Sequence, residues 1–587
     1  MLFRSLLCVG ISLTGLGLGI IGCDAEPPEV FDPRQLQQDE RSHAPEIRPQ
    51  ALRPLPTTRE NSFSDLATDT EPGHPRSDDS GRDLDTDPVI RMSLQEIIHR
   101  AVMNNHDVKV AAYQPGIEGA RVIEASANFD PTFFTNLQYA QKHDLNAGTI
   151  YNSFTGGSTF TDFNADSDQG TLQTGIQENL GSGGQVQLQY QSTYNWFNPQ
   201  TTQFNPFYES DLTLSLTQPL LRNFGYDVNH AQIVINRLNQ RVSQLEFRKA
   251  VEQNVADIEK AYWQLVQAVN DIKIQEQLVA QTEQTSRQLY NRMNQRIDVS
   301  PLQVAQAETQ LQLRRTELIQ FKAQARDLSD QIKGLMSDPE YPVTSSIVIL
   351  PADEPVEDAI QFDFEDEINT AMENRLELGE QQLKVDSAVV TIGVAKNNLL
   401  PELDFVGSTG PQGVEGNLGD TVKANFEFAH VDFTVGFKLQ IPLGNRAARA
   451  IYRRSLLQHM QAIEQYRAYI EAIAVDVKTS ARLVDTTWNV IRTSRLSRFN
   501  AQDALTRINA RETSGEPLTP EFVQLKLQIQ ESLAQAQQTE AEAVANYNIA
   551  LSQLEKSKGT ILRYDNVVLQ EDPLKIESDG PLRYAAP

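Results

Sequence analysis

The chain of 587 residues contains only two cysteines, Cys8 and Cys23, and both precede residue 24. The rest of the sequence therefore cannot form a disulfide bond, so a protein of this length must be stabilised by buried apolar surface or by assembly. Basic residues are also scarce: 51 lysines and arginines stand against 78 acidic residues, which gives a net charge of −27. This charge has the wrong sign for nucleic acid, and we exclude that class of partner.

Signatures of enzymes and of metal sites are missing as well. The eight histidines are scattered without the spacing of metal ligands. The glycine-rich residues 181–184 lead into a strand pattern, so no helix dipole stands behind them to bind phosphate. No nucleophile motif is present. We therefore predict that the chain is not an enzyme and holds no metal and no cofactor.

The first residues predict export. Arg4 precedes an almost wholly apolar run that ends in small residues, so residues 1–22 are predicted to be a cleaved signal peptide rather than a spanning helix. Residues 20–23 (IIGC) resemble the bacterial lipobox, which implies lipidation of Cys23. One acyl chain is a modest anchor. In the alternative, the signal peptide is an ordinary one and Cys23 is incidental. Asp24 resembles an inner-membrane retention signal of enteric bacteria, which leaves the sorting open.

Residues 23–91 are predicted to be a lipidated, flexible leader. Residues 24–90 hold ten of the 28 prolines and few large apolar residues, so they cannot bury enough surface to offset their ordering entropy. The aperiodic residues 563–587 are predicted to be a tail, partly packed along the surface.

Long amphipathic helices dominate the remainder. Val255, Ile258, Tyr262 and Leu265 follow the alternating three and four spacing of a heptad, with mostly polar residues between them. Two stretches without proline, 229–295 and 446–514, predict rods of about 100 Å. Shorter helices are predicted at 93–128, 301–336, 362–398 and 520–556. In each half we expect one continuous rod beside two shorter helices end to end, with turns at 298–301 and 513–520. A plain coiled-coil scaffold would show the same periodicity.

The second half of the chain resembles the first. A shift of 270 places Ala101, Asn104 and Pro131 on Ala371, Asn374 and Pro401, and a shift of 219 places Ser300, Pro301 and Val304 on Thr519, Pro520 and Val523. Two helical blocks thus keep their register while the insert between them varies in length. We predict two copies of one unit, residues 92–340 and 362–562, joined by a linker at 341–361.

The inserts, about 131–219 and 401–442, alternate apolar and polar residues as strands do. Residues 131–210 hold 14 of the 43 aromatic residues, which resembles the interfacial belt of a membrane barrel. A small sheet facing water on one side would show the same alternation. The polar residues 142–170 are predicted to be an external loop. Residues 170–196 look like a further hairpin, so each chain contributes four or six strands, and we favour four.

A few strands cannot close a barrel, and open edges are not tolerated in lipid, so several copies must pool their strands. At this point several strings resemble the TolC family of outer-membrane efflux proteins. They are 371–378 (AMENRLEL), 217–220 (TQPL), 440–443 (QIPL), 300–307 (SPLQVAQA) and 546–554 (NYNIALSQL), and the resemblance covers about 92–562. It implies a fold that is mainly α with membrane β-strands: a duplicated unit of helix, strand hairpin and helix, whose long coiled-coil-like helices form a trimeric α-barrel joined to a shared β-barrel.

The resemblance also implies a function. A homotrimer in the cell outer membrane, with its helical part in the periplasm, would be the passive exit duct of a tripartite efflux or type I secretion system. Its partners would be a periplasmic adaptor, an inner-membrane pump and outer-membrane lipid. The main alternative is an envelope-anchored coiled-coil lipoprotein that acts as an adaptor or scaffold. The sequence does not indicate the cargo or the family of the pump.

The turns between the helices depart from the family pattern, in which a glycine precedes an aspartate-valine pair. Gln303-Val304 and Phe522-Val523 occupy those places here, so the aspartate ring of the family is not carried over. The candidate tunnel-tip carboxylates are Asp298, Glu512, Glu516 and Glu521. Arg292 and Arg511, equivalent in the two copies, are the candidate tip latch. Solvated side chains and ordinary surface ion pairs are the alternatives.

Overall fold

A computed structural model describes residues 88–152, 157–198, 204–295, 297 and 299–568. The signal peptide, Cys23, most of the leader and the candidate carboxylate Asp298 lie outside the described residues. No helix in the described part of the chain is both long and apolar enough to cross a membrane.

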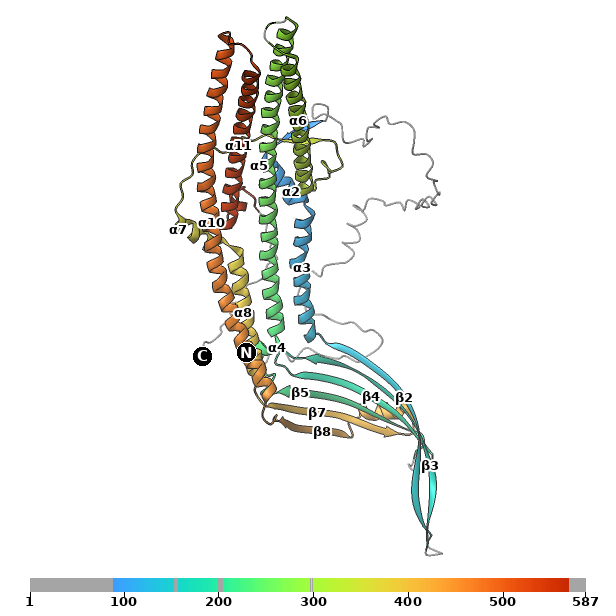
Figure 1. Cartoon of the computed structure of the whole chain (residues 1–587). Helices are drawn as coiled ribbons and strands as arrows, with labels where there is room; N and C mark the ends of the chain where they lie inside the picture. The colour runs from blue at the N-terminus through green and yellow to red at the C-terminus, as the bar shows by residue number, and fades with distance from the viewer. Residues whose placement is uncertain (1–87, 153–156, 199–203, 296, 298, 569–587) are drawn as a thin grey trace, which may run out of the picture. The chain divides into compact units, whose positions relative to one another are not determined.

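The first half begins with two short helices, continues through four strands and ends with a long and a shorter helix (Figure 1). These elements are α2 (Leu94–Asn104), α3 (His106–Ser126), η1 (Ala127–Phe129), β2 (Thr132–Asn152), β3 (Gly157–Asn179), β4 (Gln185–Asn198), β5 (Phe207–Pro219), α4 (Tyr226–Asn229), α5 (Ala231–Asn294) and α6 (Pro301–Met336). The short strand β1 (Val89–Met92) precedes them and pairs in parallel with β6 (Val348–Pro351).

The second half follows the same order with only two strands. Its elements are α7 (Phe364–Asn374), α8 (Leu376–Asn397), β7 (Glu402–Glu415), α9 (Leu418–Phe426), β8 (Val431–Gln440), α10 (Arg446–Thr513), α11 (Pro520–Lys558) and α12 (Ile561–Tyr564). The long rods predicted at 229–295 and 446–514 are present as α5 and α10, to within two residues at each end. The helix starts at Pro301 and Pro520 follow from Ser300 and Thr519, whose side chains cap the first turn ahead of the proline.

The predicted single helices at 93–128 and 362–398 are each divided into two. Asn105 separates α2 from α3: its side chain accepts a hydrogen bond from the amide of Val108 and donates one of 2.7 Å to the carbonyl of Leu335 on α6. At Arg375, between α7 and α8, the guanidinium binds Asp476 and the carbonyl of Ser557, each at 3.0 Å. At both breaks a side chain binds a distant segment of the chain, and helix periodicity does not reveal such contacts.

The packing of the helices agrees with one continuous rod beside two shorter helices in each half. Helix α5 lies against α3 and α6, α10 lies against α8 and α11, and α5 also contacts α8 and α11. The largest hydrophobic cluster joins the middle of α5 to α2, β6 and α12. Its centre is Tyr262, which is fully buried, and whose hydroxyl donates to Asp353 at 2.9 Å and accepts from the amides of Ala352 and Asp353.

The strands form one antiparallel sheet in the order β2-β3-β4-β5-β7-β8. The preference for four strands was wrong, because β3 and β4 make a further hairpin in the first half. Its turn is tight: the amide of Gly183 donates to the carbonyl of Leu180 at 2.8 Å, and Gly183 has φ of 91°. The sequence showed this turn at residues 181–184, but strand alternation does not say whether a hairpin joins the sheet.

The prediction of an external loop at 142–170 was also wrong. Strands β2 and β3 stay paired from Thr132 with Gln177 to Asn152 with Gly157, so most of these residues form a long hairpin. Two strands are held together by backbone hydrogen bonds. Polar side chains do not prevent these bonds in a hairpin that faces water on both sides.

Three of the four hydrogen bonds of the Tyr262 hydroxyl fix the segment after β6 to α5. We expect Tyr262→Phe to lower the free energy of unfolding by about 1–3 kcal/mol, since the amides of Ala352 and Asp353 lose a buried acceptor. Chemical denaturation in detergent measures this change. Tyr290→Phe, at a half-exposed position of the same helix, is the control and should have no effect. Equal effects of the two variants would show that the hydroxyl bonds contribute nothing.

Candidate functional site

The six-stranded sheet carries apolar side chains on one of its faces. Directly paired residues project to the same side, and the register pairs Leu137 with Leu172, Leu188 with both Ile176 and Leu214, and Phe405 with Phe437. This face is strongly exposed, with Leu137 at 79% and Phe433 at 76% of full exposure. An apolar surface that crosses all six strands is far too large to be left in water, so it marks a contact with lipid or protein.

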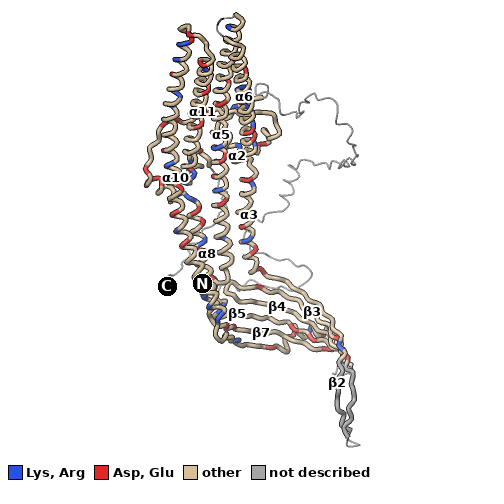
Figure 2. The backbone as a smooth tube through the Cα atoms, viewed as in Figure 1, with Lys and Arg blue, Asp and Glu red and all other residues tan. Residues whose placement is uncertain are grey.

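The opposite face is polar and uncharged over much of its area. The side-chain amide of Gln187 donates to Gln189 at 2.8 Å, and that of Gln189 donates to Gln191 at 3.3 Å. Their partners on β5 are Ser215, Thr213 and Asp211. Charged residues are spread along the helices, while the strands carry few between their ends (Figure 2). The sheet therefore separates an apolar face from one that suits water.

Aromatic rings gather at both ends of the sheet. Tyr194 lies 5.5 Å from Tyr208, and Phe197 lies 6.0 Å from Phe207, at the end of β4 and β5 that is far from the helices. Phe129 and Tyr226 stack on either side of His230, at the helix end of the sheet. Rings at both borders of an apolar zone are typical of a barrel in a bilayer.

The sheet has two open edges within the described chain. Strand β2 pairs only with β3, and β8 pairs only with β7. Almost every residue of β8 is exposed. The outer backbone groups of both strands are thus available to another strand, and an exposed edge of this length is a template for pairing.

At the other end of the helices, the turn after α5 and the turn after α10 share a small hydrophobic core. Leu289, Val304, Ile508, Phe522 and Val523 are among its members. Gln303 links the two turns, because its buried side-chain amide donates a hydrogen bond of 2.7 Å to the carbonyl of Leu518. Gln303 also caps its own helix through Ser300. We call these two turns and their core the tip.

The structure places most of the candidate tip residues in the second turn. Arg511 forms an ion pair with Glu516 five residues later and stacks over Phe522 at 5.6 Å. The bond between the two raises the pKa of Arg511 and lowers that of Glu516. Arg511 is therefore bound within its own half.

The other candidates are more widely spread. Glu512 binds the buried ammonium of Lys526 at 2.6 Å, which ties the end of α10 to α11. Glu521 is exposed, and Arg292 lies in the last turn of α5. The cross-link between the two halves is made by Gln303, which the sequence had shown only as a departure from the family pattern.

A buried arginine, Arg314, lies farther along α6 and was missed from the sequence. Its guanidinium donates to the hydroxyl of Thr282 on α5 and, at 2.9 Å, to the carbonyl of Leu527 on α11. Its burial lowers the pKa of the side chain. The signal was present, since Arg314 continues the three and four spacing of Val304, Ala307 and Leu311, all of which are buried.

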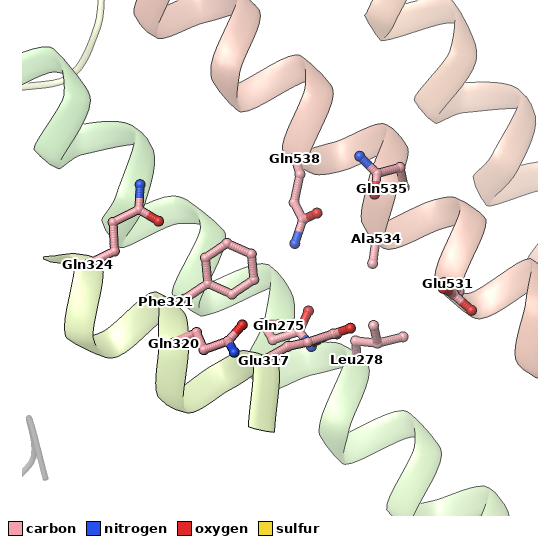
Figure 3. Close-up of a pocket in the computed structure, with 10 residues that line it drawn as sticks. All are labelled: Gln275, Leu278, Glu317, Gln320, Phe321, Gln324, Glu531, Ala534, Gln535 and Gln538. Carbon is pink, nitrogen blue, oxygen red and sulfur yellow. Dashed lines mark hydrogen bonds between the residues drawn. The ribbon is translucent and has the colours of Figure 1, made fainter. Parts of the chain in front are cut away.

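A polar groove lies beside this arginine, between α5, α6 and α11 (Figure 3). It has a volume of about 300 Å³ and is lined mainly by glutamines, among them Gln320, Gln324 and Gln538. Phe321 projects into the middle of the view, between the glutamines of α6 and α11. Among the described residues, no cluster of three histidine, cysteine or acidic side chains is arranged to hold a metal.

Two acidic side chains meet in the middle of the helices. Glu259 on α5 is 1% exposed, and neither of its carboxylate oxygens has a hydrogen-bond donor among the described residues. Asp565, directly after α12, lies beside it, with Glu555 and Tyr564 near by. Burial, and then the neighbouring carboxylate, raises the pKa of Asp565 to about 9, and burial raises that of Glu259. A shared proton satisfies both groups.

This pair predicts that the attachment of α12 depends on pH. Both pKa values are higher in the folded chain than in the unfolded one, so the stability from the pair is complete below about pH 4 and is lost as the pH rises to about 9. Hydrogen exchange of α12 measures the loss. Asp565→Asn keeps a neutral partner for Glu259 and should reduce the pH dependence to the part that the burial of Glu259 causes. Asp503→Asn, an exposed carboxylate, is the control. The same pH response in all three proteins would contradict the shared proton.

Comparison with known proteins finds similar sequences and folds. Residues 368–560 match the family model of outer membrane efflux proteins. No curated protein matches the sequence at a significant level. Among solved structures, the outer membrane protein VceC from Vibrio cholerae is 15% identical, with a TM-score of 0.55 over 79% of this chain and 96% of VceC.

Two further structures are similar. The CmeC outer membrane channel of Campylobacter jejuni is 14% identical, with a TM-score of 0.54 over 80% of this chain and 86% of CmeC. The open state of the MtrE outer membrane channel of Neisseria gonorrhoeae is also 14% identical, with a TM-score of 0.54 over 80% of this chain and 89% of MtrE. The matched family and these folds are those of channels rather than enzymes. Residues 368–560 are therefore similar to the outer membrane efflux proteins, and the chain has the TolC-like fold that its sequence predicted.

Proposed function

We propose that the protein is a passive exit channel of the outer membrane, in which three copies pool their strands into one barrel and their helices into one tunnel through the periplasm. The observation that carries this proposal is the sheet, which has an exposed apolar face, a polar face and two open edges. In lipid every backbone polar group must be paired, so such a sheet is stable there only when its edges are closed. Closure by β2 of one copy against β8 of the next leaves no free edge.

The helices support the same assembly. Helix α3 leads into β2, and α10 follows β8, so these two helices lie on the sides of the chain where the sheet is open. Both expose large apolar residues: Val110, Tyr113 and Ile123 on α3, and Val475, Leu496 and Phe499 on α10 are between 61% and 72% exposed. Apolar surface on the flanks of the open edges favours a neighbouring copy as the partner.

The remaining steps follow from this assembly. Lipidation of Cys23 would add a membrane anchor, and the helices would extend into the periplasm from the barrel. A periplasmic adaptor and an inner-membrane pump would engage the tip and supply the energy. The system would be a tripartite efflux or type I secretion system. The two halves would be copies of one duplicated unit, with the signal peptide and leader ahead of them.

The tip is the proposed gate. Gln303 holds the first turn to the second, and the ion pair of Glu512 with Lys526 holds α10 to α11. Opening would move the two hairpins apart at their ends and break the Gln303 bond first, since it joins the two turns, while the bonds of Arg314 lie farther along the helices. Glu516 and Glu521 remain as carboxylates that can face the passage.

Reconstitution in planar bilayers tests the channel. We expect discrete conductance steps, and a smaller preference for cations when Glu516 and Glu521 are changed together to Gln, because two negative charges per copy are lost near the narrowest point. Current recorded at about 0.1 M and about 1 M salt should show the difference mainly at low salt. A folded protein that stays monomeric in detergent and gives no current would favour the scaffold interpretation instead.

Removal of the Gln303 bond tests the gate. We expect Gln303→Ala to increase the open fraction of single channels several-fold, because a bond worth about 1 kcal/mol between the hairpins is lost in each copy. Gln306→Ala, at an exposed position one turn along the same helix, is the matched control and should behave like the parent. An unchanged open fraction in both variants would place the gate elsewhere.

A further inference from the structure

The sheet is unequal between the two halves of the chain. The first half contributes four strands and the second half two, and the difference is the hairpin of β3 and β4. This hairpin could stand outside the membrane or form part of the barrel wall. The two arrangements give barrels of different width, so the position of one hairpin sets the size of the passage.

The pattern of side chains favours a position of the hairpin in the barrel wall. On β4, Val186, Leu188 and Tyr190 share the apolar face of the sheet, since they pair with Leu216, Leu214 and Leu212 on β5. The intervening Gln187 and Gln189 share the polar face. Strand β4 carries no charged residue from Gln185 to Asn198. A hairpin in water has no need for an unbroken apolar face with a polar face behind it, whereas a strand between lipid and a lumen requires both.

The hairpin is also fixed in the sheet on both sides. Strand β3 pairs with β4 from Asp166 to Asn179, and β4 pairs with β5 from Gln185 to Asn195. If the hairpin left the membrane, β2 and β5 would each lose a neighbour and would have to move together across the gap. The register therefore makes β3 and β4 members of the same wall as β5, β7 and β8.

Resting on the proposed trimer, we propose that three copies of six strands close a barrel of 18 strands whose lumen passes hydrated polypeptide cargo. Barrel width grows with strand number: at a spacing of about 4.8 Å and a tilt of about 40°, 18 strands give a backbone radius of about 18 Å, and 12 strands give about 12 Å. With about 6 Å of side chain on the wall, the free bore is about 24 Å instead of about 12 Å. An α-helix with its side chains is about 11 Å across and would pass the wider bore with a layer of water.

The helices give an independent estimate of the same width. Near the sheet each copy presents α3, α5, α8 and α10 side by side. At about 9 Å between axes, four helices span about 36 Å of the wall. Six tilted strands span about 38 Å, and four would span about 25 Å. With six strands the barrel continues the helical wall at nearly constant circumference, so the bore has no step where the sheet begins.

The lining suits such cargo. The inward residues Gln187, Gln189, Thr213 and Ser215 are polar and neutral, and the glutamines bond to one another along the strand. A surface of this kind binds neither apolar nor strongly charged segments, so a hydrated chain can slide past it.

Spin labels on four single-cysteine variants test the position of the hairpin, and the two native cysteines lie before residue 24. Leu188→Cys and Gln189→Cys are on β4, and Val435→Cys and Thr434→Cys are matched controls on β8. In liposomes we expect labels at 188 and 435 to collide mostly with oxygen from the bilayer, and labels at 189 and 434 mostly with a water-soluble nickel chelate. If the label at 188 is as accessible to the nickel chelate as the label at 189, while the label at 435 stays in lipid, the hairpin is outside the membrane and the proposal is overturned. If 435 also lies in water, the proposed channel itself fails.

The width is measured on the same labelled proteins. In the Gln189→Cys variant the labels project about 6 Å into the lumen, so pulsed dipolar spectroscopy should give a distance between copies of about 21 Å for 18 strands and about 10 Å for 12. Polyethylene glycols added on the barrel side should reduce the conductance up to a hydrodynamic radius of about 10 Å. If polymers with a hydrodynamic radius above about 5 Å no longer reduce the conductance, the wide lumen is refuted, but the proposed channel function is not.

Discussion

The backbone of an open β-sheet is the constraint on which the rest of the molecule depends. The hydrogen-bonding groups of β2 and β8 on their outer sides have no strand partner within the described chain, and in lipid they cannot be left so. The sheet is not stable in water alone either, because its apolar face is exposed. These two properties of the sheet are the basis of the proposed assembly, in which copies of the chain close one wall.

In the proposed channel the helices meet a different requirement, because they would pass through water and would keep a passage between them. Their contacts combine narrow apolar stripes with single buried polar links: Tyr262 to the segment after β6, Arg314 across α5 and α11, and Gln303 across the tip. Each link has directed hydrogen bonds, so it fixes the register of two rods where an apolar stripe would allow sliding. Of these links, the one made by Gln303 lies at the ends of the two hairpins, so its loss would leave the bonds of Tyr262 and Arg314 in place.

Much of this could be read from the sequence, and the exceptions have physical causes. Proline-free stretches and capped prolines give α5, α6, α10 and α11 nearly to the residue, since helix limits are set by local chemistry. The break at Arg375 and the meeting of Glu259 with Asp565 are contacts between distant segments, so no local pattern contains them. The predicted number of strands was wrong for a related reason. The turn before β4 was visible in the sequence, but the strands with which a hairpin pairs are determined by the whole sheet.

The unequal halves then have a simple explanation. Four helices per copy are required by the two hairpins that meet at the tip, and a change in their number would alter the gate. The sheet has no such limit, because a hairpin adds two strands and returns the chain to the same edge, so the helices on either side keep their order. Insertion of β3 and β4 in one half can thus widen the barrel while the tip stays unchanged. In the proposed channel, gate and outer bore are therefore determined by separate parts of the chain, and residues such as Gln303, rather than the sheet, would set the size of the cargo at the gate.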